Sequence, residues 1–199
     1  MKTVYFMRHG ETDWNRQERL QGQQDVPLNE TGRRQAIDAG KRFQREGLRF
    51  DRVIASTLCR AGETAALATG LPFVQIERDA RIVEMSFGQY DGAPYTSLAP
   101  SIWDFFREPS KYPTPEGMER SEDMERRFAS FLDELADDPR EETVLIVTHG
   151  VAIRAMTLLL QPELGDAVWS LPIENCVLYR TELRDGTSSA PMMVDLSHI

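Results

Sequence analysis

Two short apolar runs, each followed by a histidine and a glycine, constrain the fold of this chain more than any other feature. Val4–Met7 leads into Arg8-His9-Gly10, and Thr143–Val147 leads into Thr148-His149-Gly150. Both runs favour β-strands, and the second is continuously apolar, as expected of a central strand covered on both faces. Open α/β sheets place their ligands at the carboxyl ends of parallel strands. The sequence therefore predicts that both histidines lie at one functional edge of a sheet.

The pattern after the first run is that of a helix and a second strand. A helix is expected to begin with Asn29 or Thr31 as its N-cap and to stop at Gly47. Arg52–Ser56 then forms the second strand, and the unit predicts a right-handed parallel crossover. After another helix that ends in a glycine-proline turn, Phe73–Ile76 is expected to be the third strand.

The second half of the chain completes the layers. A helix from Ser121 to Pro139 precedes the second apolar run, and a further helix follows it over 151–160. Segments 175–183 and 191–196 alternate on either side of a turn, which predicts an antiparallel hairpin at the sheet edge. These elements indicate the fold class α/β, a three-layer α/β/α arrangement with a mostly parallel central sheet and an antiparallel edge hairpin.

Chain length and one proline-rich segment bear on domain organisation. With 199 residues the chain is expected to form a single domain, 1–199, around a well-buried core. Segment 93–117 is rich in proline and aromatic residues, among them Tyr95, Trp103 and Phe106. Such a segment suits either a cap-like insertion over a pocket or a satellite core beneath a long loop, and both interpretations stay open here.

Charge and hydropathy exclude several classes of protein. The net charge of −9 argues against a nucleic-acid binder, which needs a basic face, although a few arginines at one sheet edge still attract an anionic substrate. No apolar stretch approaches the length of a membrane span. Met1-Lys2-Thr3 runs straight into the first apolar run, which is typical of a mature strand rather than of a signal peptide. We therefore expect a cytoplasmic protein that binds neither nucleic acid nor membranes.

The cysteines and histidines show no metal-ligand spacing. Cys59 and Cys176 are far apart, and we expect neither a disulfide nor thiol chemistry, although Arg60 beside Cys59 could lower the pKa of that thiol. The three histidines form no H-x-x-H or H-E-x-x-H pattern, and His198 is expected to belong to a mobile tail. The sequence thus predicts no metal site.

Four segments match a set of motifs in the expected order. They are Arg8-His9-Gly10-Glu11-Thr12 with Asn15 after it, Ser56–Ala65 as an S-x-L-x-R-A-x-x-T-A element, Glu84–Gly92, and Thr148-His149-Gly150. Together they resemble the histidine phosphatase superfamily, also called the phosphoglycerate mutase-like family. The third segment resembles its phosphatase branch, in which a glutamate precedes an aromatic-glycine pair and then an aromatic-acid-glycine triplet. The resemblance implies a phosphoglycerate mutase-like fold.

The resemblance also implies a role for five side chains. His9 would take the phosphoryl group covalently, Arg8, Arg60 and His149 would bind the phosphoryl oxygens, and Glu84 would be the proton donor. A neutral imidazole attacks phosphorus well, and neighbouring cations disfavour its protonation, so His9 is expected to stay neutral near pH 7. Beside a phosphate dianion Glu84 is expected to be protonated, and so able to protonate the leaving oxygen.

Three further residues are candidate phosphate contacts. Asn15 is expected to add a neutral donor. The resemblance places Arg19 and Gln21 at the border of the phosphate pocket, whereas as loop residues they are equally typical of solvated side chains, and both interpretations stay open. Where the family often carries Gly-Glu-Ser, this chain departs from the pattern with Gly117-Met118-Glu119-Arg120-Ser121.

These residues favour a metal-independent phosphomonoesterase that hydrolyses small phosphorylated metabolites through a phosphohistidine intermediate, with no cofactor. A cofactor-dependent phosphoglycerate mutase is the alternative, disfavoured because the segment between Glu84 and His149 is short for the mutase branch. A third hypothesis is a non-catalytic phosphate-binding regulatory module, against which all five matched positions are occupied. The expected partner is a small-molecule phosphate monoester, bound by a monomer or a homodimer.

Overall fold

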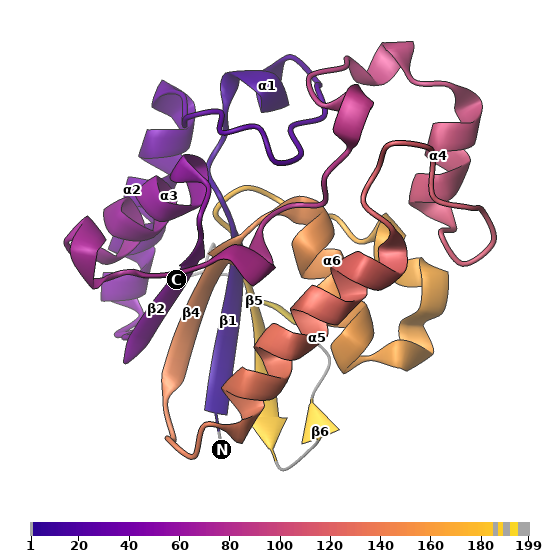
Figure 1. Ribbon diagram of the computed structural model, residues 1–199. Coiled ribbons are helices and arrows are strands. Elements are labelled where there is room, and N and C mark those ends of the chain that lie inside the picture. The colour runs from indigo at the N-terminus through magenta and orange to yellow at the C-terminus, as the bar shows by residue number, and fades with distance from the viewer. Residues whose placement is uncertain (1, 185–186, 189–191, 195–199) are drawn as a thin grey trace.

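The computed structural model describes residues 2–184, 187–188 and 192–194, and its centre is one mixed β-sheet with helices on both faces (Figure 1). The strands, in chain order, are β1 (Lys2–Arg8), β2 (Arg52–Ser56), β3 (Glu77–Asp79), β4 (Thr143–Thr148), β5 (Leu178–Arg184), β6 (Thr187–Ser188) and β7 (Met192–Val194). The α-helices are α1 (Asp13–Arg16), α2 (Glu30–Arg45), α3 (Cys59–Thr69), α4 (Pro100–Arg107), α5 (Ser121–Asp137) and α6 (Gly150–Leu160). Short 3-10 helices are η1 (Phe73–Gln75), η2 (Ala80–Ile82), η3 (Gly88–Tyr90), η4 (Tyr95–Ser97) and η5 (Pro162–Ser170).

The order and direction of the strands confirm the predicted fold class. Within the described residues the order is β3-β2-β4-β1-β5-β6, and β7 also pairs with β5. The pairs among β1 to β4 are parallel, whereas β5 runs antiparallel to β1, β6 and β7. Arg8 is in register with Thr148, so the residues that follow β1 and β4 leave the sheet side by side. Both histidine-glycine pairs therefore lie at the same edge.

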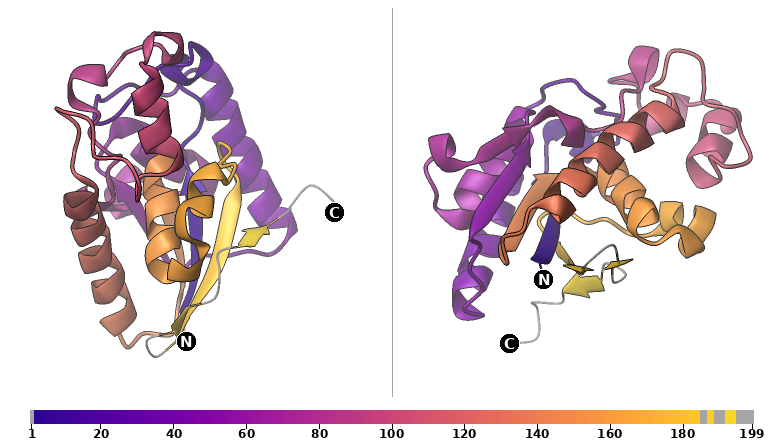
Figure 2. Two further views of the ribbon diagram at one scale, coloured as in Figure 1. Left: turned by 90° about the vertical axis from the view of Figure 1, so that its right-hand side faces the viewer. Right: turned by 60° about the horizontal axis from the view of Figure 1, so that its bottom comes forward.

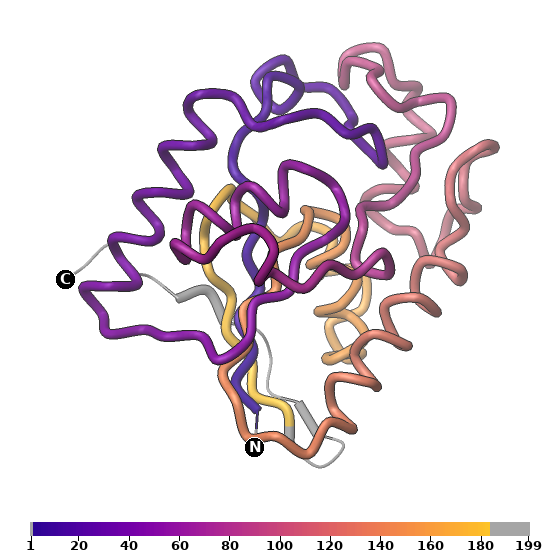
Figure 3. The backbone as a smooth tube through the Cα atoms, turned by 60° about the vertical axis from the view of Figure 1, so that its left-hand side comes forward, coloured from indigo at the N-terminus to yellow at the C-terminus, as the bar shows by residue number. Residues whose placement is uncertain are grey.

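Alternate side chains of the central strands supply two hydrophobic clusters, one on each face of the sheet. Val4 and Phe6 of β1 belong to the cluster that packs against α5 and α6, whereas Tyr5 and Met7 belong to the cluster that packs against α2 and α3. Figure 3 shows α2 and α3 side by side on one face, and the left view of Figure 2 shows α5 and α6 on the other. Burial on both faces explains why these strands read as continuous apolar runs.

Side-chain caps fix the starts of the two helices nearest the N-terminal motif. Asn29 is the N-cap of α2, as predicted, and its side chain accepts the N–H of Gly32 at 2.8 Å. Thr12 caps α1 in a reciprocal capping box with Asn15. The helix α2 ends just before Gly47, whose left-handed φ of +64° suits glycine.

The third strand lies later in the chain than predicted. The residues Phe73–Gln75 form η1, and β3 consists of Glu77–Asp79, so the prediction of a strand at Phe73–Ile76 was wrong. The physical reason is exposure, because Phe73 is 50% and Val74 91% exposed, and in this run Ile76 alone is buried. β3 is an edge strand of the described sheet and is at most half-buried, so it forms from polar residues.

The remaining boundaries are close to those expected. β5 forms the first half of the predicted hairpin, and β7 supplies part of the second half by pairing antiparallel with β5. Positions 191, 195 and 196 of that hairpin, and His198, lie outside the described residues. The helix α5 begins at Ser121, but Arg120 occupies its cap position without a side-chain hydrogen bond, so Ser121 is not the cap.

The proline-rich segment 93–117 contains η4 and α4, which lie above the end of α5 in Figure 1. Ile102 and Phe105 of α4 join the hydrophobic cluster shared with α5 and α6. Trp103 and Phe106, on the same helix, line the cavity described below. The segment is thus anchored in the core while part of it faces a cavity. Its interpretation as a cap-like insertion in a single domain stays a prediction.

Candidate active site

His9 follows β1 directly, and its surroundings fix which ring nitrogen carries a hydrogen. The residue is buried, and Nδ1 lies 2.7 Å from the backbone oxygen of Gly10. Because a carbonyl oxygen only accepts hydrogen bonds, Nδ1–H is the donor and the lone pair of the neutral ring is on Nε2. The Nε–H of Arg60 points to Nε2 at 3.3 Å. Nε2 is therefore an unprotonated nitrogen beside a guanidinium.

Burial and neighbouring cations act on both imidazoles of the site. Burial lowers the pKa of His9 well below its ordinary value, and the charges of Arg60 and then Arg8 lower it further. The sequence predicted the effect of the cations, whereas burial acts in the same direction and is the larger cause. The pKa of His149 is also lowered, by burial first and then by the charge of Arg60. Both rings are neutral at pH 7.

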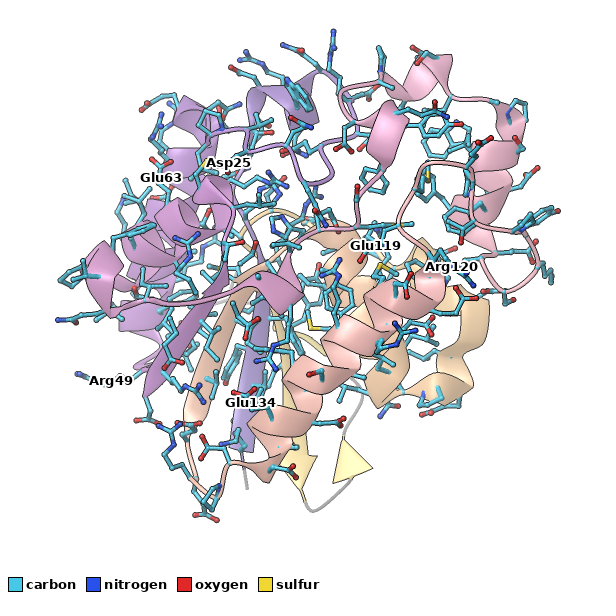
Figure 4. The ribbon with its side chains drawn as sticks, in the orientation of Figure 1. Asp25, Arg49, Glu63, Glu119, Arg120 and Glu134 are labelled. Atoms are coloured by element: carbon cyan, nitrogen blue, oxygen red, sulfur yellow. The ribbon has the colours of Figure 1, made fainter. Side chains whose placement is uncertain are left out.

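Arg60, in the first turn of α3, is fully buried and is held by the loop between α1 and α2. Its Nη1 and Nη2 donate to the backbone oxygens of Gln24 and Gly22 at 2.7 and 2.8 Å. Burial lowers the pKa of this guanidinium to about 10, which leaves it charged at neutral pH. Asp25, labelled in Figure 4, accepts the N–H of Cys59 at the start of the same helix. Loop and helix start thus hold one positive charge in place.

His149 follows β4, and its ring centre lies 5.1 Å from that of His9. The residue is fully buried, and its Nε2 lies 2.8 Å from the hydroxyl of Ser56, the last residue of β2. In the described part of the chain its Nδ1 is buried without a hydrogen-bond partner. A buried polar atom without a partner is costly unless a ligand or water satisfies it. Nδ1 is thus the nitrogen of His149 that remains available to a ligand.

The carboxylate of Glu84 is buried against the first turn of α6. One oxygen, Oε1, accepts the N–H groups of Met85 and Ala152 at 3.0 and 3.1 Å, and the other, Oε2, accepts that of Val151 at 3.2 Å. The first N–H groups of a helix have no partner within the helix, so a carboxylate placed there satisfies them and is stabilised by the helix dipole. These hydrogen bonds hold Glu84, a loop residue, at the edge of the sheet.

A buttress from α5 holds the loop of Glu84. Arg127 donates from Nη1 to the backbone oxygen of Val83 at 2.7 Å and from Nη2 to that of Glu84 at 3.2 Å. Its guanidinium forms an ion pair at 2.7 Å with Glu119, which lies just before α5 (Figure 4). Gln23 donates to the same oxygen of Glu84 at 3.1 Å. These contacts fix the backbone from which the carboxylate projects.

The turn after β1 requires glycine because two backbones meet there. A Cβ added to Gly10 would lie 2.5 Å from the backbone oxygen of Gly32, and one added to Gly32 would lie 2.1 Å from that of Glu11. Interiors are packed too closely to absorb such overlaps without a shift of the backbone. The N–H of Gly10 also donates to the hydroxyl of Thr64 on α3, at 3.0 Å. The motif is therefore clamped between α2 and α3.

A cavity of about 580 Å³ opens at this edge of the sheet. All the site residues proposed from the sequence, except His149, line it, namely Arg8, His9, Asn15, Arg19, Gln21, Arg60 and Glu84. His149 is fully buried beside His9 and is not part of the lining. The structure brings these residues together, and their roles stay predictions.

The three further candidate phosphate contacts, Asn15, Arg19 and Gln21, differ in which polar atoms they leave available to a ligand. The oxygen Oδ1 of Asn15 accepts from the N–H and hydroxyl of Thr12, at 3.1 Å each, so its amide N–H groups are the part left for a ligand. Arg19 donates from Nη1 to the backbone oxygen of Gly92 at 2.9 Å. Gln21 is buried, and its Oε1 finds no partner among the described residues. Asn15 and Gln21 thus present polar groups to the cavity that the fold itself does not use.

The cavity is also lined by residues that the sequence did not single out as site residues. Aromatic side chains from segment 93–117 and from η5 form much of this further lining: Tyr95, Trp103, Phe106 and Trp169. Arg154 of α6 also lines the cavity. One signal in the sequence marks Arg154, because it is the single charged residue in the otherwise apolar helix Gly150–Leu160. The aromatic residues carry no such signal, since an aromatic stripe is equally typical of a core.

The charge of Arg60 acts to lower the pKa of the Cys59 thiol, as the sequence suggested, but other influences outweigh it. Burial and the contact with Asp25 raise the pKa of Cys59 to about 11, and burial raises that of Cys176 to about 12. Across residues 2–184, 187–188 and 192–194, no three His, Cys, Asp or Glu side chains cluster as metal ligands would. Nor does that part of the chain contain a helix long and apolar enough to cross a membrane.

Comparison with known proteins places this geometry among related chains. The model of the histidine phosphatase superfamily (branch 1) matches residues 4–195. A probable phosphoglycerate mutase, GpmB of Yersinia pestis, is 31% identical over 192 residues, which cover 94% of this chain and 87% of that protein. The solved structure of YhfR from Bacillus stearothermophilus is 34% identical, with a TM-score of 0.84 over 96% of this chain and 95% of that one. A mycobacterial glucosyl-3-phosphoglycerate phosphatase, solved with VO3, is 27% identical, with a TM-score of 0.78 over 92% and 93% of the two chains.

Proposed function

The chain belongs to the histidine phosphatase superfamily, branch 1, and on this basis we propose that it is a phosphomonoesterase that acts through a phosphohistidine on His9 and needs no metal ion. The observation that carries the proposal is the state of the His9 ring. Nδ1–H donates to Gly10, so the unprotonated Nε2 is available in a cavity that Arg8 and Arg60 also line. An unprotonated imidazole is a good nucleophile, and two guanidiniums stabilise the phosphoryl dianion that it attacks.

In the first step Nε2 of His9 attacks phosphorus in line with the ester oxygen that leaves. An N–P bond forms, the P–O bond to the alcohol breaks, and the electron pair of that bond goes to the leaving oxygen. Protonated Glu84 gives its proton to that oxygen, so the alcohol departs neutral. The position of Glu84 in the same cavity as His9 supports this role.

In the second step water attacks the phosphorus of phosphohistidine. Glu84, now ionised, takes a proton from the water, and the N–P bond breaks so that its electron pair returns to Nε2 of His9. Inorganic phosphate is released and both groups return to their starting states. One carboxyl group therefore serves as acid and then as base.

His149 supports the phosphoryl oxygens through Nδ1–H in this mechanism. That role requires Nε2 of His149 to accept a hydrogen bond from the hydroxyl of Ser56. The hydroxyl is suited to this, because its oxygen also accepts the N–H of Leu58, at 3.3 Å, and its own hydrogen is then left for Nε2. The free amide of Asn15 adds a neutral donor.

The alternative is a phosphoglycerate mutase, which the name of the Yersinia pestis relative favours. Both reactions share the first step, and they differ in whether water or a second hydroxyl takes the phosphoryl group from His9. The similarity to a mycobacterial phosphatase over more than nine-tenths of both chains supports water as the acceptor.

Phosphate release from 4-nitrophenyl phosphate and from 3-phosphoglycerate, in excess chelator, tests the proposal. We expect release that the chelator does not change and that His9→Ala lowers by at least about 10³-fold. The unfolding free energy of the variant, measured in urea, controls for loss of the fold. Turnover that survives His9→Ala, or that requires metal, contradicts the proposal. Interconversion of phosphoglycerates after a bisphosphate primer, without phosphate release, establishes the mutase instead.

A further inference from the structure

The cavity carries more positive charge than a phosphoryl group requires. Five arginines line it, and Glu84 is the one carboxylate among its described lining residues. Two guanidiniums, Arg8 and Arg60, suffice to balance a phosphoryl dianion. Three arginines therefore remain in a protein whose net charge is −9: Arg19, Arg107 and Arg154. Excess cations gathered in one cavity of an acidic protein point to a further negative group on the ligand.

Arg154 differs from the other two because its position is fixed and one of its nitrogens is free. Its Nε and Nη2 donate to the backbone oxygen of Leu171 at 3.0 and 2.7 Å, which holds the half-buried guanidinium between α6 and η5. No carboxylate of the described chain forms an ion pair with it, and its Nη1 has no partner there. Burial and the charge of Arg8 lower the pKa of Arg154. A charge held in this way favours a bound anion over bulk water.

The free nitrogen of Arg154 faces the same open space as Arg8. A Cβ atom added to Gly150 would lie 3.9 Å from Nη1 of Arg154 and 3.7 Å from Nε of Arg8. That Nε is itself buried and lacks a hydrogen-bond partner within the described residues. Glycine at position 150 thus leaves open a space that two guanidiniums border and that any larger side chain would enter.

In the proposed mechanism this space lies beside Glu84, on the side of the cavity from which the alcohol leaves. Gly150 is the first residue of α6, and the next two residues bind the carboxylate of Glu84, the proposed proton donor to the leaving oxygen. The charge of Glu84 acts to raise the pKa of Arg154, against the larger effects of burial and of Arg8. A group on Nη1 of Arg154 therefore belongs to the alcohol part of the substrate, not to the phosphoryl group being transferred.

We propose that Arg154 is the anchor of a second anion subsite, and that the substrate is a phosphomonoester whose alcohol part carries a carboxylate. A monoanion matches the single charge and the single free nitrogen that Arg154 presents. The inference rests on the proposed phosphatase function and names the substrate class of that site. Arg107, exposed at the rim, and Arg19, bound to a loop carbonyl, attract anions without fixing one.

A matched pair of esters tests the subsite. 3-Phosphoglycerate and glycerol 3-phosphate differ by a carboxylate in place of a hydroxymethyl group, and 4-nitrophenyl phosphate has no carboxylate. We expect Arg154→Met to lower kcat/KM for 3-phosphoglycerate roughly 30-fold, as loss of a charged hydrogen bond does, and to change the other two esters less than about threefold. Arg126→Met, at an exposed arginine that pairs with Asp123 and does not line the cavity, is the control and should change all three less than about threefold.

The outcomes separate the subsite from the phosphatase function. Equal losses on all three esters in Arg154→Met mean that Arg154 acts on the phosphoryl group or on the scaffold, which overturns the subsite. A wild-type enzyme that treats the matched pair alike overturns it as well. If no ester is turned over, the phosphatase function fails, and dissociation constants still decide the subsite. The subsite proposal then requires that 3-phosphoglycerate binds more tightly than glycerol 3-phosphate. It also requires that Arg154→Met removes this difference in affinity.

Discussion

Nε2 of His149 lies 2.8 Å from the hydroxyl oxygen of Ser56, so the last residue of β2 contacts the histidine that follows the neighbouring strand β4. When the Ser56 hydroxyl donates a hydrogen bond to Nε2, the imidazole carries its own hydrogen on Nδ1. Nδ1 is the nitrogen that has no hydrogen-bond partner in the described structure. The phosphoryl contact proposed for His149 depends on this relationship.

Ser56→Ala is therefore expected to lower kcat/KM for 4-nitrophenyl phosphate about tenfold, because His149 loses the partner that selects its tautomer. The nitrogen chemical shifts of the ring, measured by NMR, should show a larger share of the Nε2–H tautomer. Ser97→Ala, an exposed hydroxyl that donates to the backbone of Pro94, is the control. An unchanged tautomer with unchanged activity would falsify the assignment to Ser56.

Arg127→Lys is expected to impair proton donation more than phosphoryl binding. Lysine cannot reproduce the planar fork that holds the backbone of Val83 and Glu84. We expect kcat to fall about tenfold on an alkyl phosphate and less than about threefold on 4-nitrophenyl phosphate, whose leaving oxygen needs less protonation. Arg126→Lys is the matched control, since Arg126 is exposed and pairs with Asp123. Equal losses on both esters would show that Arg127 does not act through Glu84.

The lowered pKa values of His9 and His149 predict how stability depends on pH. In the unfolded chain both rings take up a proton near pH 6.5, whereas the folded protein holds them neutral to a lower pH. The unfolded state binds more protons in that window, so the free energy of unfolding falls as the pH drops below about 6.5. The slope approaches about 1.4 kcal/mol per pH unit for each ring.

Urea unfolding between pH 7.5 and pH 5 measures this slope. Other groups also titrate in this pH range, so the wild type is compared with His149→Asn. The variant should lose the part of the slope that one imidazole contributes. The same pKa shift of His9 places the acid limb of kcat/KM well below pH 6.5, since the nucleophile stays neutral. A slope identical in both proteins would mean that His149 titrates normally in the folded state.

Gly32→Ala is expected to destabilise the fold by about 2 kcal/mol or more, because the new Cβ would meet the backbone oxygen of Glu11 at 2.1 Å. Since the displaced backbone carries the N-terminal motif, activity should fall as well. Gly70→Asn is the control, because its side chain meets open space and asparagine tolerates the left-handed φ of +72°. A smaller loss of unfolding free energy in Gly32→Ala than in Gly70→Asn would show that the backbone contact between Gly32 and Glu11 adjusts easily.

The parts of the fold that the sequence predicted are those in which burial alone decides the pattern. Val4–Met7 and the run before Thr148 are covered on both faces, so their apolar composition indicates strands directly. The strand expected at Phe73–Ile76 was wrong because an apolar run does not reveal whether anything covers it, and Val74 is 91% exposed. Edge strands such as β3 lack the signal altogether.

The candidate site was predictable where a motif ties residue types to a strand end. His9 and Arg60 belong to such motifs, and both lie at the cavity. The buttress made by Arg127 and Glu119 joins distant segments through backbone oxygens, and a contact to a backbone oxygen leaves no trace in the partner's side chain. The cavity wall around Trp169 depends in the same way on how η5 packs against α4 and α6.

The two walls of the cavity are formed by different segments of the chain, so evolution can change one of them without the other. Strand ends clamped between helices carry the groups proposed for phosphoryl transfer, whereas α4 and η5 supply the aromatic wall. The groups proposed for phosphoryl transfer and the aromatic wall are therefore encoded in separate stretches of the gene, whereas Arg154 follows His149 in the first of these. A lineage can exchange one substrate for another by altering the wall, with the reaction inherited unchanged. Grafting segment 93–107 from a relative is thus a direct route to a new preference.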